Sequence, residues 1–213
     1  MPLPMIHLSV AVKMNLPEEM KCPAFFLGAI SPDAVHMRDG FVREDKVHSH
    51  FDARNIDAIE NLMPLCGKVR KTEGQEQNFL LGYLVHILTD LFWNDTIDKI
   101  FVERYSCDPA PRQDRRMAYY NDTDQLDFLF YKRENWRPTV WELLEQATAY
   151  AVENAVSEGE VLAWNRRTLD WYLSGKSQHT NPIRYLEYED LERFTDYAAA
   201  ACSEYLAKQG ELI

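Results

Sequence analysis

A long apolar segment, residues 75–101, limits the architectures open to this chain. Its large side chains recur at helical spacing and occupy two neighbouring faces of the expected helix: Phe79, Tyr83, His86, Asp90 and Trp93 on one, and Leu80, Leu84, Ile87 and Leu91 on the other. A helix that is apolar nearly all round belongs in the middle of a helical bundle. The segment therefore predicts a bundle with one central helix.

Further helices follow from the same periodicity. The residues from Thr139 to Glu142 have the T-x-x-E capping-box pattern behind Pro138, which predicts a helix starting there and continuing toward residue 155. No alternating run of β-branched residues is long enough to predict a strand. The fold class is therefore predicted as all-α, a multi-helix bundle. The other expected helices are 7–14, 56–66, 124–133, 161–172 and 191–205.

Two segments are predicted to be irregular. Residues 31–49 contain SPD, RDG and mixed charges, and residues 106–114 contain CDPAPRQD. The second could mark a domain boundary, but neither side of it has an obviously complete core. We therefore expect a single domain over residues 1–213.

Charge and cysteine usage narrow the class of protein. The 23 Lys and Arg residues against 34 Asp and Glu residues leave a net charge of -11, which repels phosphate backbones, so nucleic acid is not the expected partner. The four cysteines are widely spaced, and the N-terminus lacks the features of a signal peptide. The apolar stretch 79–93 is too short and too polar to span a bilayer unaided. A soluble, cytoplasmic protein without a transmembrane segment is expected.

His86 and Asp90 are the strongest chemical signal. Residues four apart lie on one face of a helix, so both side chains can reach one point. Imidazole nitrogen and carboxylate oxygen are ordinary ligands of zinc and similar divalent ions. A bound cation would also offset the cost of burying a carboxylate among leucines. On this pair alone, a simple hydrogen bond from His86 to Asp90 or Thr89 is an equal alternative.

Other candidate ligands lie upstream. In His48-Ser49-His50 one histidine is expected to be a ligand and the other solvated. Asp33 lies in an S-P-D sequence behind an expected helix, and His7 interrupts an apolar run. Whether His36 joins the site stays open, and His179 is expected at the surface.

The order of these pieces is specific. The chain contains four elements in order: His7 in a first helix, F-x-L-G-A-I-S-P-D ending at Asp33, S-H-F around His50, and L-G-Y-L-V-H-I-L-T-D ending at Asp90. Together they resemble the zinc-dependent phospholipase C family, which is related to single-strand-specific nucleases. The resemblance covers roughly residues 1–95. It implies an all-α fold with zinc between helices, one metal shared by Asp33, His50, His86 and Asp90, and a second metal bridged by Asp90 and held by His7.

The chain departs from that pattern after Asp90. The two further histidines and the glutamate of secreted members are missing, so a third metal site is expected to be absent or rebuilt from Asp95, Asp98 or Glu103. One or two divalent ions are expected. The ligands lie in residues 1–95, and residues 96–213 complete the bundle.

The predicted function is metal-dependent hydrolysis of a small or lipid-derived phosphoester by a metal-activated water, with Asp33 binding metal or orienting that water. Two alternatives stay open. One is an HD-type phosphohydrolase, although the chain has no His-Asp dipeptide, and the other is a non-catalytic domain stabilised by metal. Phe51, Tyr83 and Trp93 could wall the site, although aromatic residues at helical spacing more often belong to the core. The candidate phosphate clamps are Arg38, Arg43, Arg112, Arg115 and Arg116, for which a solvated charged face is the favoured interpretation.

Overall fold

The computed structural model describes residues 2–210 and is all-helical, as predicted. About 70% of it is helix, and no β-strand occurs between residues 2 and 210. The α-helices are α1 Pro4–Lys13, α2 Pro23–Gly28, α3 Arg43–Ser49, α4 Met63–Lys71, α5 Gly74–Asp95, α6 Ile97–Ser106, α7 Arg115–Arg133, α8 Arg137–Glu145, α9 Glu158–Leu173 and α10 Tyr188–Lys208. The 3₁₀ helices are η1 Glu18–Met20, η2 Ser31–Met37 and η3 Ile56–Leu62.

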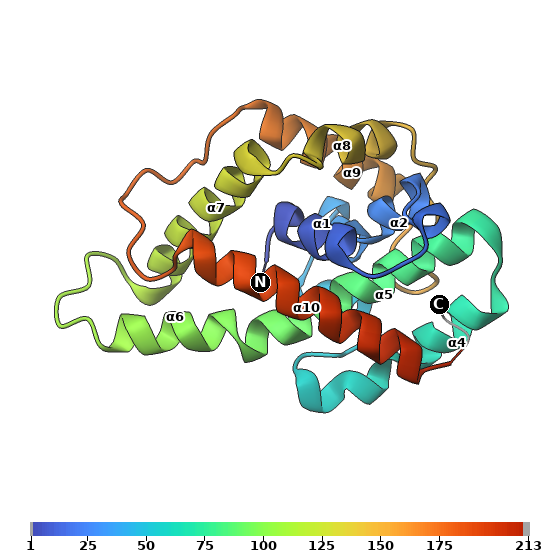
Figure 1. Cartoon of the computed structure of the whole chain (residues 1–213), viewed down its shortest axis with the longest axis horizontal. Helices are drawn as coiled ribbons and strands as arrows, with labels where there is room; N and C mark the ends of the chain where they lie inside the picture. Colours follow the sequence, from blue (N-terminus) through green and yellow to red (C-terminus); the bar gives the residue numbers. More distant parts are fainter. Residues whose placement is uncertain (1, 211–213) are drawn as a thin grey trace.

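The apolar segment forms the central helix. All residues of α5 from Phe79 to Trp93 are buried, which accounts for the lack of a polar stripe in this segment. The helix packs against α1, α2, α4, α6 and α10 (Figure 1). No helix of the described part of the chain is both long and apolar enough to cross a membrane.

The predicted helix 75–101 is wrong in one respect, because it is two helices. Thr96 separates α5 from α6 with φ −122° and ψ −77°, well outside helical values. Its hydroxyl donates to the carbonyl oxygen of Phe92 at 2.7 Å, and its N–H donates to that of Trp93 at 3.2 Å. A threonine hydroxyl that bonds a carbonyl of the preceding turn competes with the regular backbone hydrogen bonds that would continue the helix.

The predicted start of α8 is also wrong. The helix begins at Arg137, with Pro138 in its first turn, where a fixed φ and a missing N–H are tolerated. It ends at Glu145 rather than near residue 155, and Asn165 of α9 donates to the carbonyl oxygen of Leu144 at 2.8 Å. A side chain from another helix, which no local pattern announces, thus binds a carbonyl in the last turn.

The segment 31–49 is more regular than predicted. Residues 31–37 form η2, which contains Asp33, and residues 43–49 form α3. Asp45 accepts a hydrogen bond from the N–H of Val42 at 2.8 Å and so stabilises the start of α3. The segment 107–114 lies outside any helix, in agreement with the prediction for 106–114.

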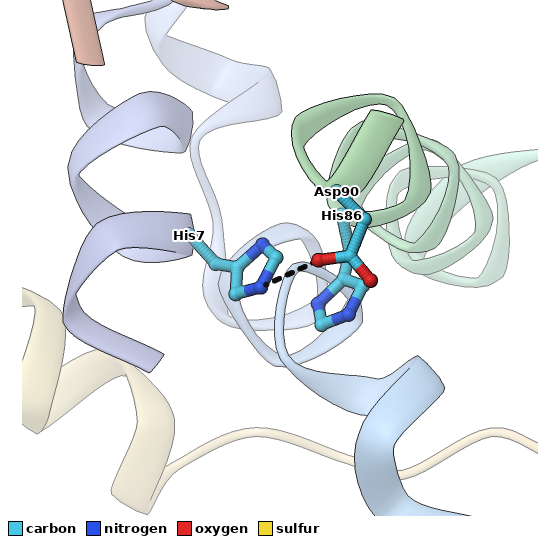
Figure 2. Close-up of side chains that lie close together, drawn as sticks. All are labelled: His7, His86 and Asp90. Atoms are coloured by element: carbon cyan, nitrogen blue, oxygen red, sulfur yellow. Dashed lines mark ion pairs between the residues drawn. The ribbon is translucent and has the colours of Figure 1, made fainter. Parts of the chain in front are cut away.

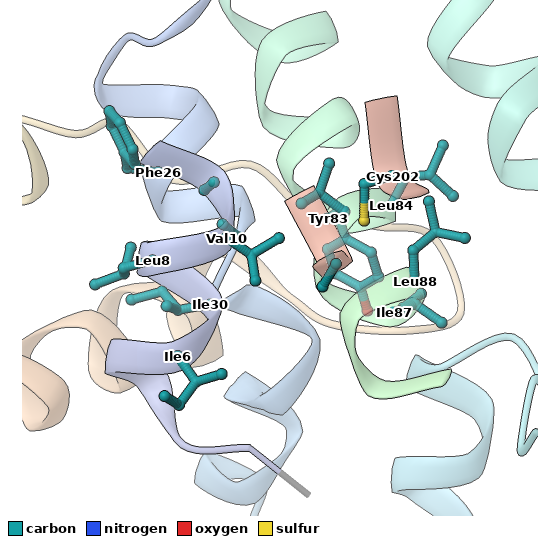
Figure 3. Packing of buried hydrophobic residues seen from close by; sticks show 14 of the residues in the cluster. Ile6, Leu8, Val10, Phe26, Ile30, Tyr83, Leu84, Ile87, Leu88 and Cys202 are labelled. Atoms are coloured by element: carbon teal, nitrogen blue, oxygen red, sulfur yellow. The ribbon is translucent and has the colours of Figure 1, made fainter. Parts of the chain in front are cut away.

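The core is one cluster of buried side chains drawn from both halves of the chain. Val10 of α1 points toward α5, whereas Leu8 points away from it, and Cys202 of α10 lies beside Leu84 (Figure 3). Helix α1 also packs against α7 and α10. The C-terminal helices thereby cover the helices that carry the predicted ligands.

Helices α2 and α5 meet backbone to backbone. A Cβ on Gly28 would lie 2.0 Å from the carbonyl oxygen of Phe79, and a Cβ on Gly82 would lie 2.0 Å from that of Phe25. Both positions therefore require glycine, because the obstructing atoms belong to the main chain. This contact fixes the end of α2 against the segment of α5 that carries His86.

We expect Gly82→Ala to lower the free energy of unfolding by about 3 kcal/mol, because the methyl group would push the two helices apart. Gly67→Ala in α4 is the matched control, since a Cβ there meets nothing within 4 Å. It should be neutral or stabilising by up to about 1 kcal/mol. Urea unfolding of both variants measures the difference, and equal stabilities would contradict the close contact.

Candidate metal centre

The structure brings all five predicted site residues together. His7 comes from α1, Asp33 from η2, His50 from the position directly after α3, and His86 and Asp90 from α5. None of the five is more than 8% exposed. Four separate elements thus deliver three imidazoles and two carboxylates into one buried cluster.

His7, His86 and Asp90 form the first group of potential ligands. One ligand atom from each lies within 4.8 Å of the others. The Nε2 atom of His7 is 3.5 Å from Oδ1 of Asp90, which is too long for a hydrogen bond, and points toward it across the gap between α1 and α5 (Figure 2). The spacing leaves room for an ion between the side chains.

Asp33, His50 and His86 form the second group, again within 4.8 Å. The Nε2 atom of His50 is 3.7 Å from Oδ1 of Asp33 and 3.2 Å from Oδ2 of Asp90. The Nε2 atom of His86 is 4.0 Å from Oδ2 of Asp33. The two groups therefore share His86 and adjoin through Asp90.

Main-chain carbonyls determine which imidazole nitrogens can bind metal. The Nδ1 atom of His86 is 2.9 Å from the carbonyl oxygen of Ala29, and that of His50 is 2.9 Å from the carbonyl oxygen of Lys46. A carbonyl can only accept, so each Nδ1 carries the proton and donates. Each Nε2 then presents a lone pair, and both are buried without a hydrogen-bond partner. Such outer hydrogen bonds typically orient metal-ligating histidines.

Burial keeps His7 and His86 neutral. It lowers the pKa of His86 to about 4 and holds the pKa of His7 well below 6.5, and the neighbouring His86 lowers the latter further. The two rings stack with centroids 3.7 Å apart and planes 6° apart. Both nitrogens of His7 are buried and unpartnered. Neutral imidazole is the form that binds metal.

The two carboxylates are ionised. Burial by itself would raise the pKa of Asp33, but Lys46, His86 and His50 outweigh it and hold that pKa well below 3.8. For Asp90, burial is likewise outweighed, here by the close approach of the His50 ring at 3.2 Å and by the nearby His86 and His7, so its pKa is lowered. Neutral imidazoles beside ionised carboxylates are the protonation state that a divalent cation requires.

Lys46 is the site residue that the sequence analysis missed. Its ammonium donates to Oδ1 of Asp33, while its carbonyl oxygen accepts from the ring of His50. The signal was its position four residues before His50, which places its carbonyl oxygen beside that ring. With two carboxylates and one ammonium, the cluster has a formal charge of −1.

The other candidate ligands lie apart from the cluster. His48 is exposed, with Nδ1 3.8 Å from Asp52, and His179 is half-buried outside the cluster. For the third site, expected to be absent or rebuilt from Asp95, Asp98 or Glu103, no ligand group within residues 2–210 contains any of these three residues. Asp95 pairs with Lys99, and Asp98 accepts from the indole N–H of Trp93.

A cavity of about 1060 Å³ adjoins the cluster. Asp33 and Lys46 line the cavity on the side of the cluster, and His36 lines it as well. The ring centroid of His36 lies 4.5 Å from that of Phe41 and 5.9 Å from that of Trp164. Thr123 of α7 also lines the cavity, so both halves of the chain contribute. The cluster thus has access to a space large enough for a small molecule.

Two of the five candidate phosphate clamps, Arg43 and Arg116, line this cavity. Arg38 does not, because it is bound to Asp45 and Glu160. Arg112 and Arg115 line other pockets.

The three aromatic side chains considered as a wall of the site do not line the cavity. Tyr83 and Trp93 are fully buried in the core, and Phe51 packs edge-on against Tyr83 at 6.3 Å. Their helical spacing reflects core packing, whereas Phe41, Tyr120 and Trp164 line the cavity.

Comparisons of the chain with protein families, with curated proteins and with solved structures found no match. The geometry of the cluster and its cavity therefore carries the functional argument.

Acid should destabilise the metal-free protein between about pH 6.5 and 4.5. In this window the unfolded chain takes up protons on His7 and His86, whose pKa values are lowered in the folded state, so the free energy of unfolding falls as pH falls. The slope is at most about 1.4 kcal/mol per pH unit for each histidine. Urea unfolding with chelator at stepped pH measures it.

The His86→Gln variant should lose part of this slope, because it removes one of the titrating rings. A wild-type stability that stays flat across the window would contradict the buried, neutral histidines.

Proposed function

We propose that this protein is a metal-dependent hydrolase of a small or lipid-derived phosphoester. The observation that carries the proposal is the position of the five-residue cluster, whose Asp33 also lines a cavity with positively charged side chains. Buried ligands supply a metal site, and the cavity supplies access for an anionic substrate. The order of motifs shared with the zinc-dependent phospholipase C family supports the same reaction class.

Zinc is the proposed ion, because three imidazoles and two carboxylates suit it in donor type. One ion per chain fits the cluster best. His86 belongs to both ligand groups but has only one available lone pair, since Nδ1 donates to Ala29. A single divalent ion would change the formal charge from −1 to +1, whereas two would leave +3 in a buried site.

The chain's own groups define the roles around the ion. When bound, zinc polarises a phosphoryl oxygen and lowers the pKa of a water molecule. Asp33 lies at the boundary between cluster and cavity, where its carboxylate can orient the attacking water and accept its proton. Lys46 adds a positive charge on the same side, which favours the phosphoryl group.

The cavity also favours catalysis over a non-catalytic metal domain. A structural zinc site is closed by its four protein ligands, whereas a catalytic site keeps a position for water or substrate. Asp33 contacts the cluster on one side and the cavity on the other. A purely structural site would gain nothing from this opening.

Purified protein should contain about one zinc ion per chain and hydrolyse members of a phosphoester panel. His86→Ala should lose the ion and fall to the background rate, because it removes the ligand shared by both groups. His48→Ala is the matched control, since this exposed histidine lies two residues from His50 and outside the cluster. Mass spectrometry of bound metal and a turnover assay test both points. Metal-free wild-type protein, or equal turnover in His86→Ala, would contradict the proposal.

Lys46→Met should tighten zinc binding by about tenfold, because the ammonium competes with the ion for Asp33 and repels it. It should also slow turnover, since the substrate loses a positive charge. Competition with a chromophoric chelator measures the affinity, and Lys99→Met, an exposed lysine paired with Asp95, serves as control. Weaker zinc binding in Lys46→Met would show that the lysine supports the ion rather than opposing it.

A further inference from the structure

Resting on the proposed function, we infer that the cavity selects a phosphoester that carries a second anionic group, a phosphate or a carboxylate. The phosphoester would lie against Asp33 and Lys46, and arginines from other helices would bind the second group.

The cavity is basic although the chain is acidic. Arg43, Lys46, Arg116 and Arg167 line it, and Asp33, the only carboxylate among the described residues of its lining, is already bound to Lys46. The whole chain has a net charge of -11. A local excess of positive charge in an acidic protein attracts anions to this one place.

The three arginines of the cavity have no carboxylate partner within residues 2–210. No ion pair links Arg43, Arg116 or Arg167 to an acidic group within 4.0 Å, whereas Arg38 and Arg104 are paired with Asp and Glu side chains. Their guanidinium charges are available to a ligand. The ion and Lys46 already compensate the negative charge of one phosphoryl group. The positive charge of the three arginines therefore remains for a second anionic group.

Aromatic rings support two of these arginines. The guanidinium of Arg167 lies 4.9 Å from the ring centre of Trp164, and that of Arg116 lies 5.7 Å from that of Tyr120. A guanidinium on an aromatic face keeps its N–H edge free for bidentate binding of phosphate or carboxylate. The stacking therefore limits the side-chain freedom that ligand binding would otherwise have to remove.

The elements that carry the arginines surround the cavity. Arg43 begins α3, Arg116 lies in the first turn of α7, and Arg167 lies on α9. A volume of about 1060 Å³ exceeds what a single phosphate fills, and the metal cluster adjoins it only through Asp33 and Lys46. A ligand with two separated anionic groups can reach both the cluster and these helices.

Three non-hydrolysable probes test the inference on the zinc-loaded protein by calorimetry: propylphosphonate, 3-phosphonopropionate and propane-1,3-diphosphonate. The two doubly anionic probes should bind roughly tenfold more tightly than propylphosphonate, the gain typical of one charge-assisted contact. Comparison of the two identifies the second group as carboxylate or phosphonate. The tighter binding of the doubly anionic probes relative to propylphosphonate should persist after zinc is removed, because the arginines bind the second anionic group. Equal affinities for all three probes would overturn the inference.

Arg116→Gln and Arg167→Gln locate the second site. Each should abolish most of the advantage of the doubly anionic probes while leaving propylphosphonate within twofold of wild type. Their sequence neighbours provide matched controls, Arg115→Gln and Arg166→Gln, since neither side chain lines this cavity. Loss of the advantage in the controls as well would show a general charge effect and overturn the inference.

The two proposals fail separately. Selective binding of doubly anionic probes without turnover of any phosphoester would refute the hydrolase and leave the anion site standing. Turnover of simple phosphoesters with no preference for a second anionic group would refute the anion site and leave the hydrolase standing.

Discussion

Two ionised carboxylates buried beside three imidazoles impose the main constraint on this structure. Asp33 and Asp90 can lie in the core only where positive charge compensates them. Lys46 supplies one charge, and a divalent cation would supply the rest. The helices around the cluster must therefore hold its side chains at fixed spacing. The glycine contact between α2 and α5 helps to hold this spacing, because it brings the carbonyl oxygen of Ala29 to the ring of His86, which donates to it.

Periodicity and motif order predicted much of the fold and of the cluster. The buried α5 followed from its apolar faces, and α9 and α10 followed from their spacing. The juxtaposition of His7 with Asp90 was implied only by the family resemblance, because two helices far apart in sequence must pack before these side chains can meet. The break at Thr96 and the early end of α8 escaped prediction, since a hydroxyl bond and the distant Asn165 decide them.

Lys46 and the cavity were beyond sequence reasoning for a related reason. A lysine among mixed charges on a short helix is indistinguishable from a solvated residue until η2 packs against α3 and brings Asp33 to it. Arg116 and Arg167 lie about fifty residues apart and join one cavity through the packing of α7 against α1 and of α9 against η2. The same burial that hides the cluster also holds the pKa of His86 near 4 and keeps its ring ready for an ion.

Lys46 acts through two different parts of one residue. Its main-chain oxygen orients His50, and its side chain neutralises Asp33. The first role is independent of residue type, so evolution can alter the second without disturbing the ligand geometry. Replacement of the lysine by a neutral side chain would keep the main-chain hydrogen bond to the His50 ring but would leave Asp33 without its compensating charge.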